Sequence, residues 1–309
     1  MNQVKFSCFS DIHHTFYLYH TDAERRLTEI QKRAKENNVD FIIHCGDFAH
    51  EPRECTDFIA QYNNFEIPSY HVLGNHDSDA QPIEETIRLL GMPAEYYFFD
   101  KNGFRFICLN ANYCKIDGNY VPYSEGNYFQ HLDDRDYISE EQIAWLRDVL
   151  MSSPYPNVIL SHSHLCLEDD VSGISLKNRE DVQDVIREAN ATGHRVLMCI
   201  NGHLHRDYMR IYENVCYLDI NSASYEWTGI PHNFYPKEIT DRYSGADHTV
   251  IYNDPVHAII TLSEDGTIEI EGMKSSFFMG VDRAMVTGDH CVGGRKCTPD
   301  VLSAKLRLF

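Results

Sequence analysis

The sequence lacks any run of 18 apolar residues, so it contains no stretch long enough to span a membrane as a helix. Its first residues also lack the charged-then-apolar layout of a signal peptide, and we therefore expect a cytoplasmic protein with no membrane partner. No Cys-x-x-Cys pair occurs among the ten cysteines, which argues against a structural zinc site. Internal repeats, low-complexity tracts and an inter-domain linker are absent too, which favours one large domain.

Positive charge is scarce, because 27 Lys and Arg residues stand against 47 Asp and Glu residues and leave a formal net charge of −20. Such a chain repels a long nucleic acid, since non-specific binding to nucleic acid rests on neutralising its phosphates. We therefore expect no long nucleic acid as a partner. A small anionic substrate would have to be attracted locally, by bound cations rather than by the field of the whole protein.

The cysteines are placed as buried, unpaired residues rather than as a disulfide framework. Cys8, Cys45 and Cys199 lie inside apolar runs, where a free thiol behaves as a small hydrophobic side chain. Cys291 and Cys297, which flank a Gly-Gly turn, could instead pair or bind a metal. A hydrophobic fraction of 43% is in keeping with a globular protein that has a substantial core.

The first third of the chain alternates strand and helix patterns. Helical periodicity is predicted over 22–37, 53–62 and 82–90, and this alternation with short apolar strands implies a parallel sheet. Five polar clusters along the whole chain each follow a strand-like run. Because the carboxyl ends of parallel strands meet at one sheet edge, these clusters predict a single site. They are Asp11-Ile12-His13, Gly46-Asp47, Gly74-Asn75-His76-Asp77, His162 and Gly202-His203-Leu204-His205.

The remaining segments complete the predicted domain. Asp22 is expected to cap the helix over 22–37. Further helices are expected to start at a Ser139 capping box and at Asn178, and hairpins are expected near 96–110, 208–220 and 256–271. We predict one domain over residues 1–271, with irregular insertions near 111–137 and 222–249, and a C-terminal extension over 272–309. Aromatic side chains in the insertions either pack these loops or stack on a substrate ring: Tyr113, Tyr120, Tyr123, Tyr128, Tyr225 and Trp227.

The clusters are rich in carboxylate and imidazole groups, which suit Mn, Fe or Zn. In an extended chain, residues i and i+2 point the same way, so Asp11 and His13 are expected to reach one metal. His203 and His205 have the same spacing and are expected to serve either one metal or two adjacent metals. The clusters therefore predict a metal site, for one divalent ion or for two adjacent ions.

In this order, the five clusters resemble the motifs of the calcineurin-like metallophosphoesterases. The resemblance extends from Asp11 to His205 and implies an α/β fold: a four-layered α-β-β-α sandwich with two β-sheets flanked by helices. It also implies two metals at one end of the sandwich. By family role, the first metal is held by Asp11, His13 and His205, the second by Asn75, His162 and His203, and both are bridged by Asp47.

The resemblance gives His76 and Asp77 catalytic roles. His76 would contact the phosphate and help the leaving group depart, and Asp77 would orient the His76 imidazole. The implied activity is a dimetal phosphoesterase that hydrolyses a small-molecule phosphate ester, with a phosphodiester favoured. A hydroxide held between two cations would attack the phosphorus directly.

Two other functions stay open on this fold. A nuclease of the same superfamily is one, although the net charge of −20 weighs against it. A non-catalytic interaction scaffold is the other, although no expected ligand position is missing. Two subfamily patterns are not matched: Phe48 follows Asp47 where purple acid phosphatases carry a Tyr ligand, and Ser163 follows His162 where cyclic-nucleotide phosphodiesterases often carry a second His.

Overall fold

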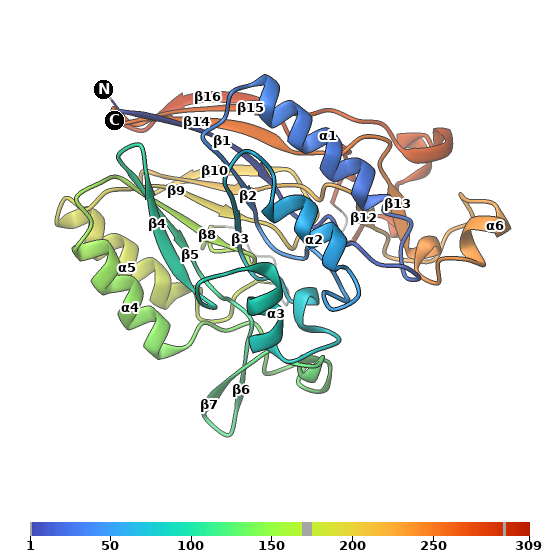
Figure 1. The fold of residues 1–309 in the computed structure, drawn as a ribbon, viewed down its shortest axis with the longest axis horizontal. Helices are drawn as coiled ribbons and strands as arrows, with labels where there is room; N and C mark the ends of the chain where they lie inside the picture. The colour runs from blue at the N-terminus through green and yellow to red at the C-terminus, as the bar shows by residue number, and fades with distance from the viewer. Residues whose placement is uncertain (1, 169–174, 293–294) are drawn as a thin grey trace.

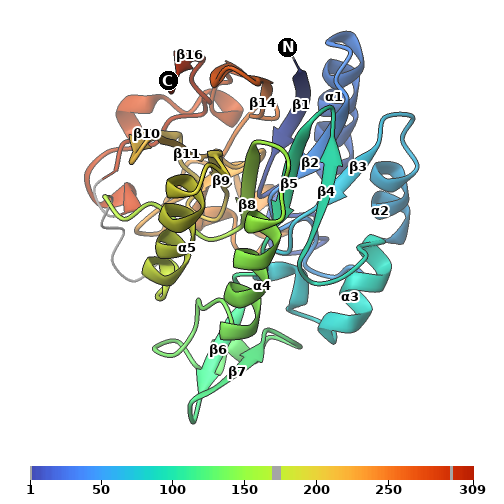
Figure 2. The same cartoon turned by 90° about the vertical axis from the view of Figure 1, so that its left-hand side faces the viewer.

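The computed structural model describes residues 2–168, 175–292 and 295–309. Two six-stranded sheets pack face to face, and helices cover the outer face of each sheet (Figure 1 and Figure 2). This arrangement confirms the predicted four-layered α-β-β-α sandwich. Each helix in these ranges is too short or too polar to cross a lipid bilayer.

The first sheet has the strand order β16-β15-β14-β1-β2-β3. Its centre is parallel, because β1 pairs with β2 and β2 pairs with β3 in the same direction, as the alternation of strand and helix patterns predicts. The other half of the sheet is antiparallel. The strands are β1 (Gln3–Phe9), β2 (Phe41–His44), β3 (Ser69–His71), β14 (Ala258–Ser263), β15 (Thr267–Gly272) and β16 (Ala304–Arg307).

The second sheet has the order β10-β11-β9-β8-β5-β4, and its four inner strands are parallel. Every residue of β8 and β9 is buried, because both faces of a parallel sheet are covered. The strands are β4 (Tyr97–Lys101), β5 (Phe104–Cys108), β8 (Asn157–Ser161), β9 (Val196–Asn201), β10 (Tyr208–Tyr212) and β11 (Val215–Asp219).

The helices lie on the two outer faces. In Figure 1, α1 and α2 lie along the first sheet, whereas α4 and α5 pack side by side on the second. Ser139 accepts a hydrogen bond from the Gln142 backbone N–H, which confirms the predicted cap of α4. The helices are α1 (Ala23–Glu36), α2 (Thr56–Asn63), α3 (Ile83–Leu90), α4 (Glu140–Met151), α5 (Arg179–Ala191) and α6 (Lys237–Thr240).

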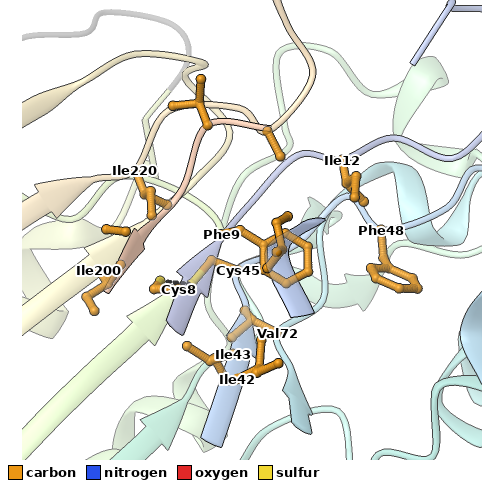
Figure 3. Close-up of a cluster of buried hydrophobic side chains, with 14 of the residues drawn as sticks. Cys8, Phe9, Ile12, Ile42, Ile43, Cys45, Phe48, Val72, Ile200 and Ile220 are labelled. Carbon is orange, nitrogen blue, oxygen red and sulfur yellow. Dashed lines mark hydrogen bonds between the residues drawn. The ribbon is translucent and has the colours of Figure 1, made fainter. Parts of the chain in front are cut away.

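The main hydrophobic core fills the space between the sheets and extends to the strand ends that precede the polar clusters. Figure 3 shows buried side chains from the ends of β1, β2 and β9, among them Phe9, Ile43 and Ile200. The Cys8 and Cys45 sulfur atoms lie 3.6 Å apart, well beyond the disulfide bond length of about 2.05 Å. No disulfide joins any of the described cysteines, and the thiols at the strand ends therefore serve as core side chains.

The segments that appear irregular in the sequence contain more regular structure than predicted. Residues 111–137 include a hairpin of β6 (Tyr113–Ile116) and β7 (Asn119–Pro122), and residues 222–249 contain β12 (Tyr225–Trp227), which pairs with β13 (Thr249–Ile251). The chain after Gly272 returns to the first sheet, because β16 pairs with β15. These pairings were missed because short strands outside a repeating α/β pattern carry a weak periodic signal.

One buried histidine away from the polar clusters gives a prediction on stability. Burial lowers the pKa of His71 to about 3, and its Nε2 lies 3.0 Å from Asn63 Oδ1. Because unfolding restores an ordinary pKa near 6.5, the unfolded chain binds more protons between these values, and stability falls as the pH drops below about 6.5. Between pH 7 and pH 5 this single group is expected to cost about 2 kcal/mol.

The test compares urea unfolding of the wild-type protein and His71→Gln at the two pH values. Gln keeps a side-chain N–H for Asn63 but does not titrate, so we expect its free energy of unfolding to fall by about 2 kcal/mol less than that of the wild type. An identical fall in both proteins would show that His71 does not contribute to the pH dependence.

Candidate metal centre

The loops that follow five strands meet at one edge of the two sheets. The loops after β1 and β2 run side by side, since the backbone N–H of Asp11 donates to Gly46 O at 2.9 Å and that of His13 donates to Asp47 O at 3.0 Å. The loops after β8 and β9 are joined by the Gly202 N–H, which donates to His162 O at 3.0 Å. All five polar clusters of the sequence are therefore brought to one place.

Two groups of side chains converge there. In the first group, which consists of Asp11, His13 and His205, the Nε2 atom of His205 lies 3.2 Å from Asp11 Oδ1 and 3.0 Å from His13 Nε2. The second group consists of Asp47, His162 and His203. Thus the rings of His203 and His205, two residues apart in the sequence, belong to different groups.

Asp47 lies between the groups. Its Oδ2 is 3.2 Å from His162 Nε2 in the second group and 3.8 Å from His13 Nε2 in the first. Its Oδ1 accepts the backbone N–H of His76 at 2.8 Å, which fixes the orientation of the carboxylate. Asn75 adds an oxygen to the second group, because its Oδ1 lies 3.1 Å from His162 Nε2.

The imidazole rings are held by their outward-facing nitrogens. His162 Nδ1 lies 2.8 Å from Cys45 O, and His205 Nδ1 lies 2.8 Å from Tyr225 O. Because a carbonyl only accepts, both Nδ1 atoms must donate, and each neutral ring then turns an unprotonated Nε2 toward the centre. This pattern is typical of metal-binding histidines.

The donor atoms at the centre need positive charge between them. With both Nδ1 atoms donating, each inward Nε2 faces a carboxylate oxygen at 3.2 Å, so two lone pairs oppose each other in each group. Asp11 Oδ1 is buried and has no hydrogen-bond partner among the described residues. Burial disfavours a charged His162, yet the charges of Asp47 and Asp11 outweigh it and raise the His162 pKa to about 10, so the carboxylates draw positive charge to this ring, either as a proton on Nε2 or as a cation beside the neutral ring. The residues therefore fit two divalent cations.

The backbone of these loops differs from the sequence-based prediction. Asp11 and His13 have φ values of 53° and 50°, so the extended geometry assumed for this pair is wrong. The strand β1 ends at Phe9, and the loop then turns through the left-handed region, which L-residues rarely adopt. Asp47, His203 and His205 have positive φ values too. Such strain is common where a site imposes side-chain directions.

Two motif glycines are required by the close packing of the loops. A Cβ atom at Gly74 would lie 2.1 Å from the backbone N of Asp47 and 2.2 Å from its Oδ1. Gly46 has φ +102°, and a Cβ there would lie 2.2 Å from His162 Nδ1. A larger residue at either position would displace a carboxylate or imidazole of the site.

Asp77 does not orient the His76 imidazole, so this prediction is wrong. The Asp77 carboxylate is fully buried and points away into the backbone of the neighbouring loop. It joins the loops after β2 and β3, which is a structural role. It accepts hydrogen bonds from four backbone N–H groups, those of Asp47, Phe48, Ala49 and Gly74, at 2.7–3.1 Å.

Asp79 takes the position that Asp77 was expected to fill. Its Oδ2 lies 2.7 Å from His76 Nδ1 and 3.3 Å from His50 Nδ1, and its Oδ1 accepts a hydrogen bond from Tyr128 Oη at 2.5 Å.

Burial alone would raise the Asp79 pKa, but hydrogen bonds to His50 and His76 lower it to about 2. Burial alone would lower the His76 pKa, but the Asp47 charge and the bond to Asp79 raise it to about 9. The two carboxylates therefore favour the protonated form of the His76 imidazole.

The sequence did contain a signal for this pair. Residues His76–Ser78 form a 3₁₀ turn, and in such a turn the side chains at i and i+3 lie one above the other. The spacing His76-x-x-Asp79 fits that geometry.

A pocket of about 380 Å³ opens beside these groups. Asn75, His76 and His203 are among the residues that line it. Of the aromatic residues singled out in the sequence, Tyr128 and Trp227 line the pocket, whereas Tyr123 and Tyr225 are fully buried and do not line it. The wall of the pocket therefore comes in part from both insertions.

Comparisons with known proteins agree with this geometry. The family model of the calcineurin-like phosphoesterases matches residues 4–207. A manganese-dependent ADP-ribose/CDP-alcohol diphosphatase of Oryza sativa subsp. japonica is 27% identical over 212 residues, which cover 56% of this chain and 64% of that protein. The chain thus matches less than two thirds of that relative's length. A 3′,5′-cyclic-nucleotide phosphodiesterase of Nostoc sp. is 24% identical over 205 residues, covering 64% of this chain and 68% of that protein.

One solved structure has the same fold as this chain, and the match covers nearly the whole length of that structure. A dimetal phosphatase from Danio rerio aligns with a TM-score of 0.63 at 15% identity, covering 90% of this chain and 99% of that chain. The family model matches most of the chain, and all five motifs converge at one site in a shared fold. This chain therefore belongs to the calcineurin-like phosphoesterase family.

Proposed function

We propose that this protein hydrolyses a phosphodiester of a small molecule with the help of two divalent cations, which are Mn, Fe or Zn. The observation that carries the proposal is the pair of groups in which imidazole and carboxylate lone pairs face each other, with Asp47 between them. The proposed ligands are Asp11, His13 and His205 for the first cation, Asn75, His162 and His203 for the second, and Asp47 for both.

Bound cations would supply an activated water-derived nucleophile at neutral pH and would neutralise the phosphate oxygens. The chain itself supplies the proton for the leaving group. His76 lines the pocket, and because its Nδ1 is held by Asp79, its Nε2 is left to donate. The negative charge of Asp79 favours the protonated imidazole. Attack is direct in this scheme, since it requires no phosphorylated side chain.

Three observations favour a small substrate. The pocket volume of about 380 Å³ suits a single small molecule. The net charge of −20 opposes a long nucleic acid, which weighs against the nuclease alternative. The two curated relatives are named for phosphate esters of nucleotide type: ADP-ribose or CDP-alcohols in one case and cyclic nucleotides in the other.

The test is hydrolysis of bis(p-nitrophenyl) phosphate beside p-nitrophenyl phosphate, with Mn²⁺, Zn²⁺ and Fe²⁺ supplied in turn. We expect turnover that depends on the added metal and is faster for the diester than for the monoester. Faster turnover of the monoester would make the protein a phosphatase. A protein that binds no metal and turns over neither compound would instead support the scaffold alternative.

A further inference from the structure

Two arginines line the pocket beyond the proposed cation ligands. Arg135 comes from the first insertion and Arg295 from the C-terminal segment, and both border the same cavity as Asn75, His76 and His203. In a chain with a net charge of −20, two guanidinium groups at one pocket are a local concentration of positive charge. Arg295 lies beyond residues 4–207, which the family model matches, and Arg135 belongs to none of the five polar clusters.

Arg295 is incompletely paired within the described part of the chain. Its Nη1 is buried and has no hydrogen-bond partner, and its Nε donates only a long bond to Val292 O at 3.4 Å. Burial raises the pKa of the nearby Glu226 well above its usual range, despite the opposing charge of Arg295, so this carboxyl is a weak neutralising partner. A buried donor without a partner is costly, and an anion at the pocket would satisfy it.

Arg135 is also only partly neutralised. Its Nε lies 3.5 Å from Asp136 Oδ2, and the Asp136 carboxylate already accepts a hydrogen bond from Tyr123 Oη at 2.8 Å. The Arg135 guanidinium lies 5.7 Å from the centre of the Tyr128 ring, and its side chain remains 30% exposed. It is thus held at the pocket wall while part of its side chain stays exposed.

Aromatic rings complete this wall. Phe129 lines the pocket and is 53% exposed, so its ring is accessible to a ligand there. Trp227 is half-buried and is held by an edge contact with Tyr19, at 5.2 Å between ring centres. Both rings line the same pocket as the arginines and offer a flat apolar surface to a planar group.

We propose that Arg135 and Arg295 form a second phosphate subsite, and that the substrate is therefore a nucleotide-like diester with two linked phosphates. This inference rests on the proposed function, which places the reacting phosphate at the cation ligands. The second phosphate then lies against the two guanidinium groups, and the base or sugar lies against Phe129 and Trp227. A cyclic phosphodiester has one phosphate and would leave the arginines unpaired.

The test is equilibrium binding by calorimetry, with Mn²⁺-loaded protein and two nucleotides: α,β-methylene-ADP, whose phosphate linkage resists cleavage, and AMP. We expect the diphosphate to bind at least about tenfold more tightly than AMP, as charge-assisted hydrogen bonds at the second phosphate imply. In Arg295→Gln and in Arg135→Gln, this preference is expected to fall to within about threefold. Arg147→Gln, which breaks an exposed ion pair on α4, is the matched control and is expected to keep the preference.

Equal affinity of the wild-type protein for both nucleotides would overturn the subsite, and this comparison needs no variant. An equal loss of AMP and diphosphate affinity in Arg295→Gln would also overturn it, because Arg295 would then contact the first phosphate. Thermal unfolding of each variant checks that the fold is intact. Because binding requires no turnover, failure of this subsite and failure of the proposed hydrolysis are separate results.

Discussion

Asp47→Asn is expected to lower the turnover of bis(p-nitrophenyl) phosphate by about 10³-fold or more, which corresponds to about 4 kcal/mol. The substitution keeps the shape of the side chain but removes the charge that lies between the two groups. The Asp47 Oδ2 atom lies within 4 Å of Nε2 atoms from both groups, at 3.2 Å from His162 and 3.8 Å from His13. An amide would present either a neutral oxygen or an N–H₂ donor there, and neither holds two cations together.

Metal content separates this explanation from a general loss of structure. We expect elemental analysis to find about two metal ions in the wild-type protein and fewer in Asp47→Asn, with little change in far-ultraviolet circular dichroism. Asp57→Asn is the control, because Asp57 is exposed in the first turn of α2. An Asp47→Asn protein that retains both metals and full turnover would contradict the shared role of Asp47.

Asp79→Asn is expected to lower kcat by about 10²-fold for an alkyl phosphodiester, with a much smaller effect on a p-nitrophenyl ester. Asp79 is a positioning residue: it holds His76 Nδ1 at 2.7 Å and favours the protonated ring. General acid catalysis contributes about 10² to 10⁴-fold, and a good leaving group needs little of it. The leaving-group dependence of kcat is thus the measurement that identifies the role.

Asp77→Asn provides the contrasting variant. Asp77 accepts four backbone N–H groups and contacts no imidazole nitrogen among the described residues, so its replacement is expected to lower the melting temperature rather than change the leaving-group dependence. Metal content in Asp79→Asn should equal that of the wild type. If Asp77→Asn instead reproduced the leaving-group effect and Asp79→Asn did not, the assignment of the two carboxylates would have to be reversed.

The repeating part of the fold was predictable because its signals are local. An apolar run such as Phe41–Cys45 is stabilised by burying its side chains in any fold, so it predicts a buried strand by itself. The helical spacing over 22–37 can likewise be recognised from that segment alone. The predicted cap at Asp22 shows the limit of that reasoning. Its side chain makes no cap bond and pairs with Arg25 instead, because its backbone is left-handed with φ 50°.

By itself, the sequence determined the order of strands and helices in the repeating part of the fold and the five polar clusters at strand ends, because periodicity and motif spacing depend on neighbouring residues. Only the tertiary structure decided that Asp79, not Asp77, contacts His76, since that choice depends on a 3₁₀ turn and on the loop after β2. The same holds for Arg295, which reaches the pocket from a distant part of the chain. Contacts between residues far apart in sequence leave no local pattern, because they form only when the sheets pack.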